Sequence, residues 1–80
     1  MKLYQYKDRC NLSGPNIKRL REERGFSQEE LAAKMQLLGL EINQNAISRV
    51  ELGYRVVPDY ELLYFARVFE VSVQELLTEQ

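Results

Sequence analysis

Residues 27–53, SQEELAAKMQLLGLEINQNAISRVELG, decide the fold of this chain. Ser27 is followed three residues later by Glu30, which is the pattern of a capping box and predicts a helix that opens at Ser27. Gly39 predicts the end of that helix, because glycine readily adopts the left-handed conformation found after helix ends. A second, shorter helix is expected at about 44–52. The stretch therefore predicts two helices joined by a turn.

The second helix of this stretch is expected to have two chemically different faces. Asn43 is a favoured N-cap residue, and Ile47 and Val50 follow at a spacing that predicts a buried stripe. The other face is polar and can both bind phosphates and read base edges. Its residues are Gln44, Asn45, Ser48 and Arg49. A helix anchored on one side and polar on the other is typical of nucleic-acid recognition.

The wider sequence resembles the helix-turn-helix regulators of the phage repressor and Cro type, also called the Xre family. Four segments carry the resemblance in the family's order: IKRLREERGF (17–26), SQEELA (27–32), AISRVELG (46–53) and ELLYFARVFEVSVQELL (61–77). The resemblance implies an all-α, compact five-helix domain at 14–78, preceded by an N-terminal arm at 1–13. It also implies a sequence-specific, double-stranded DNA-binding transcriptional regulator, a repressor that acts as a homodimer by occupying its operator.

The resemblance further assigns DNA-binding residues. These are Gln28, Asn43, Gln44, Asn45, Ser48, Arg49 and Arg55. Gln28 matches the family's phosphate-contacting glutamine at a helix N-terminus. The amides of Gln44 and Asn45 are suited to adenine in the major groove, and Arg49 to guanine or a phosphate. Arg55 matches a basic residue that lies against the DNA backbone.

An internal ion pair is also implied by the resemblance. The arginine that matches Arg21 points inward in the family and pairs with the glutamate at the end of the recognition helix, here Glu51. Such a pair fixes geometry more than it adds stability, but removing one partner leaves a buried charge uncompensated.

The segment MQLLGLEI (35–42) departs from the family pattern, being roughly five residues longer than a tight helix-turn-helix connection. We expect about one extra turn on the first helix, ending near Leu38. Its apolar residues leave two interpretations open, packing on the core or a subunit interface. They are Leu37, Leu38, Leu40 and Ile42. Leu52, at a position often polar in the family, is expected to add packing.

Three further helices complete the prediction. Ser13-Gly14-Pro15 predicts the start of the first, because proline suits the first helical turn, and Gly25 predicts its end. A fourth helix is expected from about Val57, and its core residues are Leu62, Leu63, Phe65, Ala66 and Phe69. Ser72 and Glu75 form a second candidate capping box. The short last helix, with Leu76 and Leu77, is a candidate dimer contact.

Composition bounds the function. Eighty residues predict one small domain, and the net charge of -1 gives no support for a nucleic-acid partner. The charge is unevenly distributed, since residues 1–25 hold seven basic and three acidic groups, whereas residues 58–80 hold one and five. A basic end can therefore face phosphates.

Several classes of function lack support in the sequence. There is no histidine, no nucleophile near a base and no glycine-rich phosphate loop, so no enzyme, cofactor or metal is expected. The single cysteine, Cys10, is expected to be a small residue in the arm. No apolar run reaches a membrane span, and the protein is expected to be cytoplasmic with no membrane partner.

Two alternatives stay open. The acidic balance and the long connection suggest a protein-interaction module on the same fold, such as an antitoxin-like protein that binds a protein partner. The basic and aromatic arm, with Leu3, Tyr4 and Tyr6 among cations, can be loosely ordered, packed on the domain or in contact with DNA.

Overall fold

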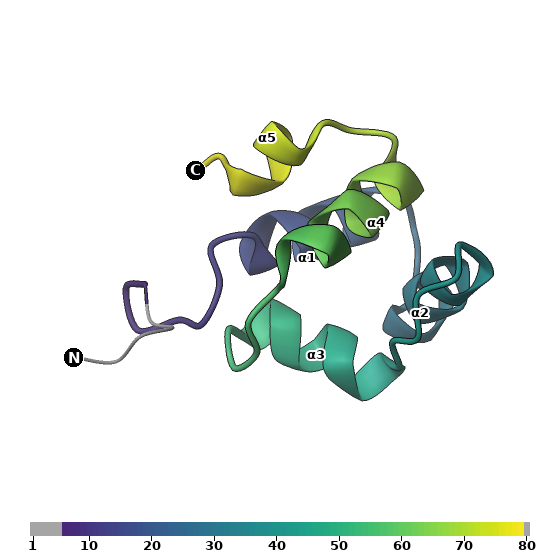
Figure 1. Ribbon diagram of the computed structural model, residues 1–80, viewed down its shortest axis with the longest axis horizontal. Coiled ribbons are helices and arrows are strands. Elements are labelled where there is room, and N and C mark those ends of the chain that lie inside the picture. Colours follow the sequence, from purple (N-terminus) through teal and green to yellow (C-terminus); the bar gives the residue numbers. More distant parts are fainter. Residues whose placement is uncertain (1–5, 80) are drawn as a thin grey trace.

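The computed structural model describes residues 6–79 and contains five α-helices in that range (Figure 1). They are α1 (Gly14–Glu23), α2 (Gln28–Leu37), α3 (Gln44–Leu52), α4 (Asp59–Phe69) and α5 (Val73–Leu77). The predicted all-α, five-helix fold is therefore confirmed. None of the helices in the described part is long and apolar enough to span a membrane.

The core lies where α1, α2, α3 and α4 converge, and α5 covers α1 and α4 (Figure 1). Phe65 and Phe69 are fully buried at its centre, and α5 adds the buried Leu76. The remaining buried apolar residues are Ile17, Leu20, Leu31, Ala32, Met35, Ile42, Ile47, Val50 and Ala66. Most of them recur at the three- and four-residue spacing that places side chains on one helix face.

Local hydrogen bonds fix most helix starts where the sequence predicts them. The Ser27 hydroxyl accepts from the Glu30 backbone N–H, and the Glu30 carboxylate accepts in return from the Ser27 N–H, so the predicted capping box is present. The Asn43 side chain caps α3 by accepting from the Ala46 N–H at 2.8 Å. Ser72 caps α5 through the Glu75 N–H, but the return bond from the Ser72 N–H to the Glu75 carboxylate is not formed, so the second predicted capping box is only half present. At α1 the Ser13 side chain makes no capping bond, and Pro15 lies in the first turn of the helix.

Leu52 and Leu63, which are expected to pack in the core, and Leu37, for which core packing is one of two interpretations, lie at the surface. Leu37, Leu52 and Leu63 are 86%, 57% and 52% exposed. Each follows or precedes a fully buried residue by two positions, namely Met35, Val50 and Phe65. Two residues turn a helix by about 200°, so the second side chain points away from the core.

The long connection between α2 and α3 divides into an exposed and a packed part. As predicted, α2 ends before Gly39, whose φ of +99° is left-handed. Leu38, in the exposed part with Leu37, is 43% exposed, so the expectation that these two pack on the core is wrong. Beyond the turn Leu40 packs against the core and Ile42 is buried within it.

The arm segment, which we define as residues 6–13, is packed against the domain (Figure 1). A short turn closed by Tyr6 and Arg9 begins it, and the Cys10 N–H donates to the Gly53 carbonyl at 2.8 Å. Of the interpretations left open above, the packed one therefore holds for this segment. The expectations for Leu3 and Tyr4 fall on residues outside the described range.

Candidate nucleic-acid interface

α3 presents the two faces that its sequence predicts. Ile47 and Val50 are fully buried, while Asn45 and Arg49, one turn apart, are exposed. Gln44 and Ser48 are half-buried beside them. Asn43 is exposed, but its side-chain oxygen is occupied by the helix cap.

A buried ion pair holds α3 against α1. Arg21 Nε donates to Glu51 Oε2 at 2.6 Å and Arg21 Nη2 to Glu51 Oε1 at 3.0 Å, so the expected partners are in bidentate contact. The Glu51 carboxylate raises the pKa of the Arg21 guanidinium above its ordinary value. Arg21 also donates to the Phe26 carbonyl in the loop between α1 and α2. The pair therefore joins α1, the loop before α2 and α3.

Two glutamines extend this pair to the N-terminal end of α3. Gln28 Nε2 donates to Glu51 Oε1 at 3.1 Å, and Gln44 Nε2 donates to Gln28 Oε1 at 2.7 Å. A carboxylate only accepts hydrogen bonds, so it fixes the amide orientation of Gln28, and Gln28 in turn fixes that of Gln44. The Gln44 side chain is thus held in one orientation. Its carbonyl oxygen and second N–H make no bond within the described chain.

The cations around α3 are not equivalent. The Arg49 guanidinium is exposed and makes no hydrogen bond or ion pair to other described residues. The Arg55 guanidinium contacts both oxygens of Glu61, at 2.6 and 3.0 Å, and donates to the Val56 carbonyl. Glu61 raises the pKa of Arg55 through these bonds. A phosphate contact by Arg55 stays a prediction, but the structure places this side chain on Glu61.

The first turn of α2 lies next to Gln28 and carries two carboxylates, Glu29 and Glu30. Glu30 is turned back onto the Ser27 backbone N–H, and this bond lowers the pKa of its carboxyl group. The free N–H groups of the helix start still favour an anion, although Glu29 offsets part of that preference.

Sequence analysis missed three residues that shape this region: Arg9, Asn11 and Glu61. Asn11 and Glu61 are buried polar side chains, and Arg9 is partly buried. Asn11 donates to two main-chain carbonyls, of Val50 and Arg55, about forty positions along the chain. No local sequence pattern predicts such contacts, because Asn11 and its two partners are far more than one helical turn apart in the sequence. Glu61 lies in the first turn of α4, where acidic residues are common for another reason, the helix dipole.

Residues 6–79 contain no group of three His, Cys, Asp or Glu side chains placed to hold a metal ion. The side chains that α3 and its neighbours present here are the amides of Gln28, Gln44 and Asn45, the Ser48 hydroxyl and the Arg49 guanidinium. Such a surface can bind and discriminate hydrogen-bonding partners.

Comparison with known proteins agrees with this geometry. A sequence model of the helix-turn-helix family matches residues 17–76, which is more than half of the 80-residue chain. The match spans α2 and α3 and the helices that support them. No curated protein and no solved structure matches the chain.

Proposed function

Because the chain belongs to the helix-turn-helix family of DNA-binding regulators, of the phage repressor and Cro type, we propose that it binds double-stranded DNA sequence-specifically with α3 in the major groove. The observation that carries the proposal is the series of hydrogen bonds from Arg21 through Glu51 and Gln28 to Gln44. A side chain held in one orientation before binding loses little conformational entropy when it meets a base.

In this proposal Gln44, Asn45 and Arg49 read base edges. Gln44 keeps one N–H and its carbonyl oxygen for the N6 and N7 atoms of adenine. Asn45 offers the same pair of groups one residue on, and Arg49 can bind guanine bidentately. Ser48, half-buried between them, supplies a single hydroxyl, and Asn43 contributes through the helix cap.

Gln28 contacts a phosphate in this proposal. Its second N–H is unused, and it lies in the first turn of α2, where backbone N–H groups point toward an approaching anion. Gln28 also accepts the hydrogen bond that orients Gln44. A shift of Gln28 on the phosphate would therefore move the side chain that reads the base. Phosphate contacts set the register of a protein on DNA, and base contacts supply the discrimination.

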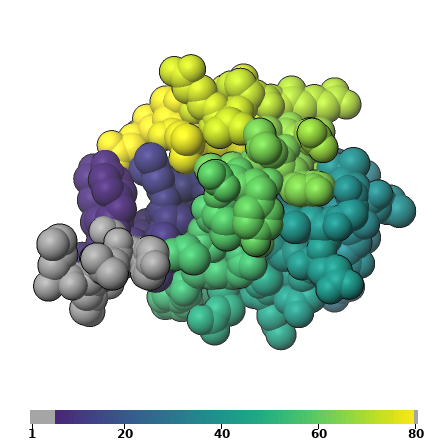
Figure 2. Space-filling view, viewed as in Figure 1, coloured from purple at the N-terminus to yellow at the C-terminus, as the bar shows by residue number. Residues whose placement is uncertain are grey.

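We place a second copy of the chain on the exposed apolar residues that follow α3, which we call the α3–α4 face: Leu52, Tyr54, Val56, Tyr60 and Leu63. This segment, green in Figure 2, protrudes on the side shown there. Arg55 and Glu61 neutralise each other at this surface, so Asp59 is the one uncompensated charge between residues 52 and 63. A two-fold axis at this end of α3 brings two recognition helices side by side. The α5 helix offers less apolar surface, because Leu76 is buried.

The dimer acts as a repressor by occupancy. Two copies of α3 would occupy half-sites about 34–36 Å apart, one turn of DNA, and exclude polymerase or a competing protein. The antitoxin-like alternative is favoured by Leu37 and Leu38, two adjacent exposed apolar residues at the end of α2 that a protein partner could cover.

Selection of bound fragments from random DNA, at two salt concentrations, tests the proposal. We expect an enriched motif with two symmetric half-sites, and we expect Arg49→Ala to relax the preference at one position of each half-site. Arg24→Ala, whose side chain donates to the Phe69 carbonyl at the end of α4, is the control and should leave the motif unchanged. Recovery of no motif would favour the protein-interaction alternative, and a single half-site would contradict the dimer.

A further inference from the structure

The arm segment closes on the C-terminal end of α3. Arg9 Nη2 donates to the Glu51 carbonyl at 2.9 Å and contacts the Val50 carbonyl at 3.4 Å. The Cys10 N–H donates to the Gly53 carbonyl at 2.8 Å. The last carbonyls of a helix have no hydrogen-bond donor within the helix. The arm segment therefore supplies donors to the carbonyls at the end of α3.

Asn11 connects this helix end to two other elements. Its Nδ2 donates to the carbonyls of Val50 and Arg55, at 2.9 and 2.8 Å, and its Oδ1 accepts from the Gly14 N–H at 2.8 Å. Both amide N–H groups are thus used, and the carbonyl partners fix the orientation of the amide. One buried side chain therefore ties α3 to the start of α1 and to the loop before α4.

The fit between these elements is close enough to require glycine at two positions. A Cβ on Gly14 would lie 2.4 Å from the Val50 carbonyl oxygen, and a Cβ on Gly53 would lie 2.8 Å from Cζ of Arg9. Gly53 also has a φ of +86°, which favours glycine. The arm segment and α1 are therefore pressed against the end of α3 with no room between them.

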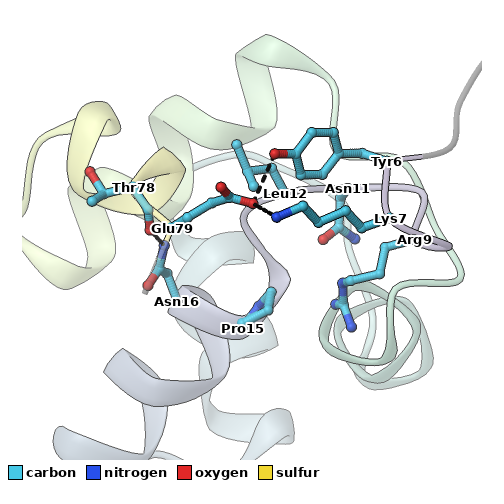
Figure 3. A pocket seen from close by; sticks show the side chains of 9 residues that line it. All are labelled: Tyr6, Lys7, Arg9, Asn11, Leu12, Pro15, Asn16, Thr78 and Glu79. Carbon is cyan, nitrogen blue, oxygen red and sulfur yellow. Dashed lines mark hydrogen bonds and ion pairs between the residues drawn. The ribbon is translucent and has the colours of Figure 1, made fainter.

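The guanidinium of Arg9 lies at the negative end of the α3 dipole, where a cation is favourable. Its charge is directed at the protein's own carbonyls, and the side chain forms part of the wall of the hollow drawn in Figure 3. Arg9 is thus placed to hold α3 and is not extended toward solvent as a phosphate contact would be.

On the other side, the arm segment is tied to the end of the described chain. The Tyr6 hydroxyl donates to Glu79 Oε1 at 2.8 Å, and Lys7 Nζ lies 3.1 Å from the same oxygen (Figure 3). A hollow of about 260 Å³ lies between these contacts and the start of α1. These ties are exposed, so the buried contacts of Arg9 and Asn11 hold the segment in place.

We infer that Arg9 and Asn11 are positioning residues for base reading, an inference that rests on the proposed function. Gln28 and Gln44 fix the N-terminal end of α3, and the arm segment fixes the other end. Asn45 and Glu51 are about 9 Å apart along the helix, so a tilt of about 6° about one end moves the other by about 1 Å. A displacement of that size breaks a hydrogen bond to a base.

The test compares Arg9→Ala with Arg24→Ala. Arg24 Nη2 donates to the Phe69 carbonyl at 2.7 Å, so each variant removes one arginine from the C-terminal end of one helix, but only Arg9 touches α3. Binding is measured to the selected duplex and to a scrambled duplex of the same composition, each at two salt concentrations. We expect Arg9→Ala to weaken binding to the selected duplex about tenfold, the lower part of the range for one bidentate base contact. Binding to the scrambled duplex and the salt dependence should stay as in the wild type.

Other results overturn the inference. Equal losses in Arg9→Ala and Arg24→Ala would show that Arg9 acts only through stability. An equal loss on both duplexes, with a salt slope lower by about one, would show that Arg9 binds a phosphate. If Arg9→Ala does not fold, Arg9→Lys decides, since a loss on the selected duplex alone supports positioning and wild-type binding contradicts it. A wild-type chain that selects no duplex overturns the proposed function and this inference together.

Discussion

Two arginine–glutamate pairs flank α3 with nearly the same geometry. In each pair the shorter bond is 2.6 Å and the second is 3.0 Å. The Glu51 and Glu61 side chains are 4% and 5% exposed. One pair joins α1 to α3, and the other joins the loop after α3 to the first turn of α4. The same interaction thus fixes α3 to α1 on one side and the loop that follows α3 to α4 on the other.

The pairs differ in the surroundings of the arginine. The Arg21 side chain is 13% exposed, whereas that of Arg55 is 29% exposed. Glu51 accepts a third bond from Gln28, and Glu61 has no such additional donor among the described residues. The two arginines thus differ in exposure while the two carboxylates are equally buried. A buried carboxylate requires a partner, so its position decides where the arginine side chain is held, even when that arginine is partly exposed. Arg55, expected on the DNA, lies beside such a carboxylate.

Breaking the first pair should have the largest effect. We expect Arg21→Ala to lower the free energy of unfolding by about 3 kcal/mol, because it leaves the Glu51 carboxylate buried with Gln28 as its remaining donor. Denaturant unfolding measures this. A double-mutant cycle with Glu51→Gln is the control. The variant that carries both Arg21→Ala and Glu51→Gln should recover part of the unfolding free energy that Arg21→Ala loses. An additive double variant would contradict direct coupling.

Breaking the second pair should cost less, about 2 kcal/mol in Arg55→Ala, because Arg55 is partly hydrated. This variant also separates the two roles of Arg55. If the guanidinium stays on Glu61 in the complex, the salt dependence of DNA binding should not change. A salt slope lower by about one would instead show the phosphate contact that the resemblance implied.

The ion pair of Lys7 and Glu79 is the most exposed of the three pairs compared, and breaking it should have the smallest effect on stability. Hydrogen bonds from Tyr6 and then Lys7 hold the pKa of the Glu79 carboxyl below its ordinary value. Its contribution is therefore present above the ordinary glutamate pKa and is lost as the pH falls through the lowered value. NMR titration of the Glu79 carboxyl should show the lowered pKa, and Glu79→Gln should lower the unfolding midpoint only slightly at neutral pH, because the pair is exposed. An ordinary pKa would contradict the Tyr6 contact.

The outward positions of three leucines share one physical cause. Leu37, Leu52 and Leu63 are apolar, but each lies about 200° around its helix from a fully buried neighbour. Residue type alone suggested burial, while helical spacing indicates the surface. The spacing was available in the sequence, so these errors concern how the pattern was interpreted.

The arm segment and the orientation of the site residues are a different matter. Asn11 meets Val50 and Arg55 across some forty residues, and no spacing rule relates them. The same holds for Gln28 and Gln44, whose contact requires α2 and α3 to cross at one angle. The sequence identified these two glutamines but not the bond between them.

By itself the sequence determined the five helices, their caps at Ser27, Asn43 and Ser72, and the family to which the chain belongs. Those features depend on hydrogen bonds and side-chain spacing within about one helical turn, which neighbouring residues set on their own. Only the tertiary structure decided that Arg55 rests on Glu61 and that Arg9 and Asn11 close the end of α3. Which donor meets a buried carboxylate or a free helix-end carbonyl depends on how distant segments pack together, and that is fixed only when the core forms.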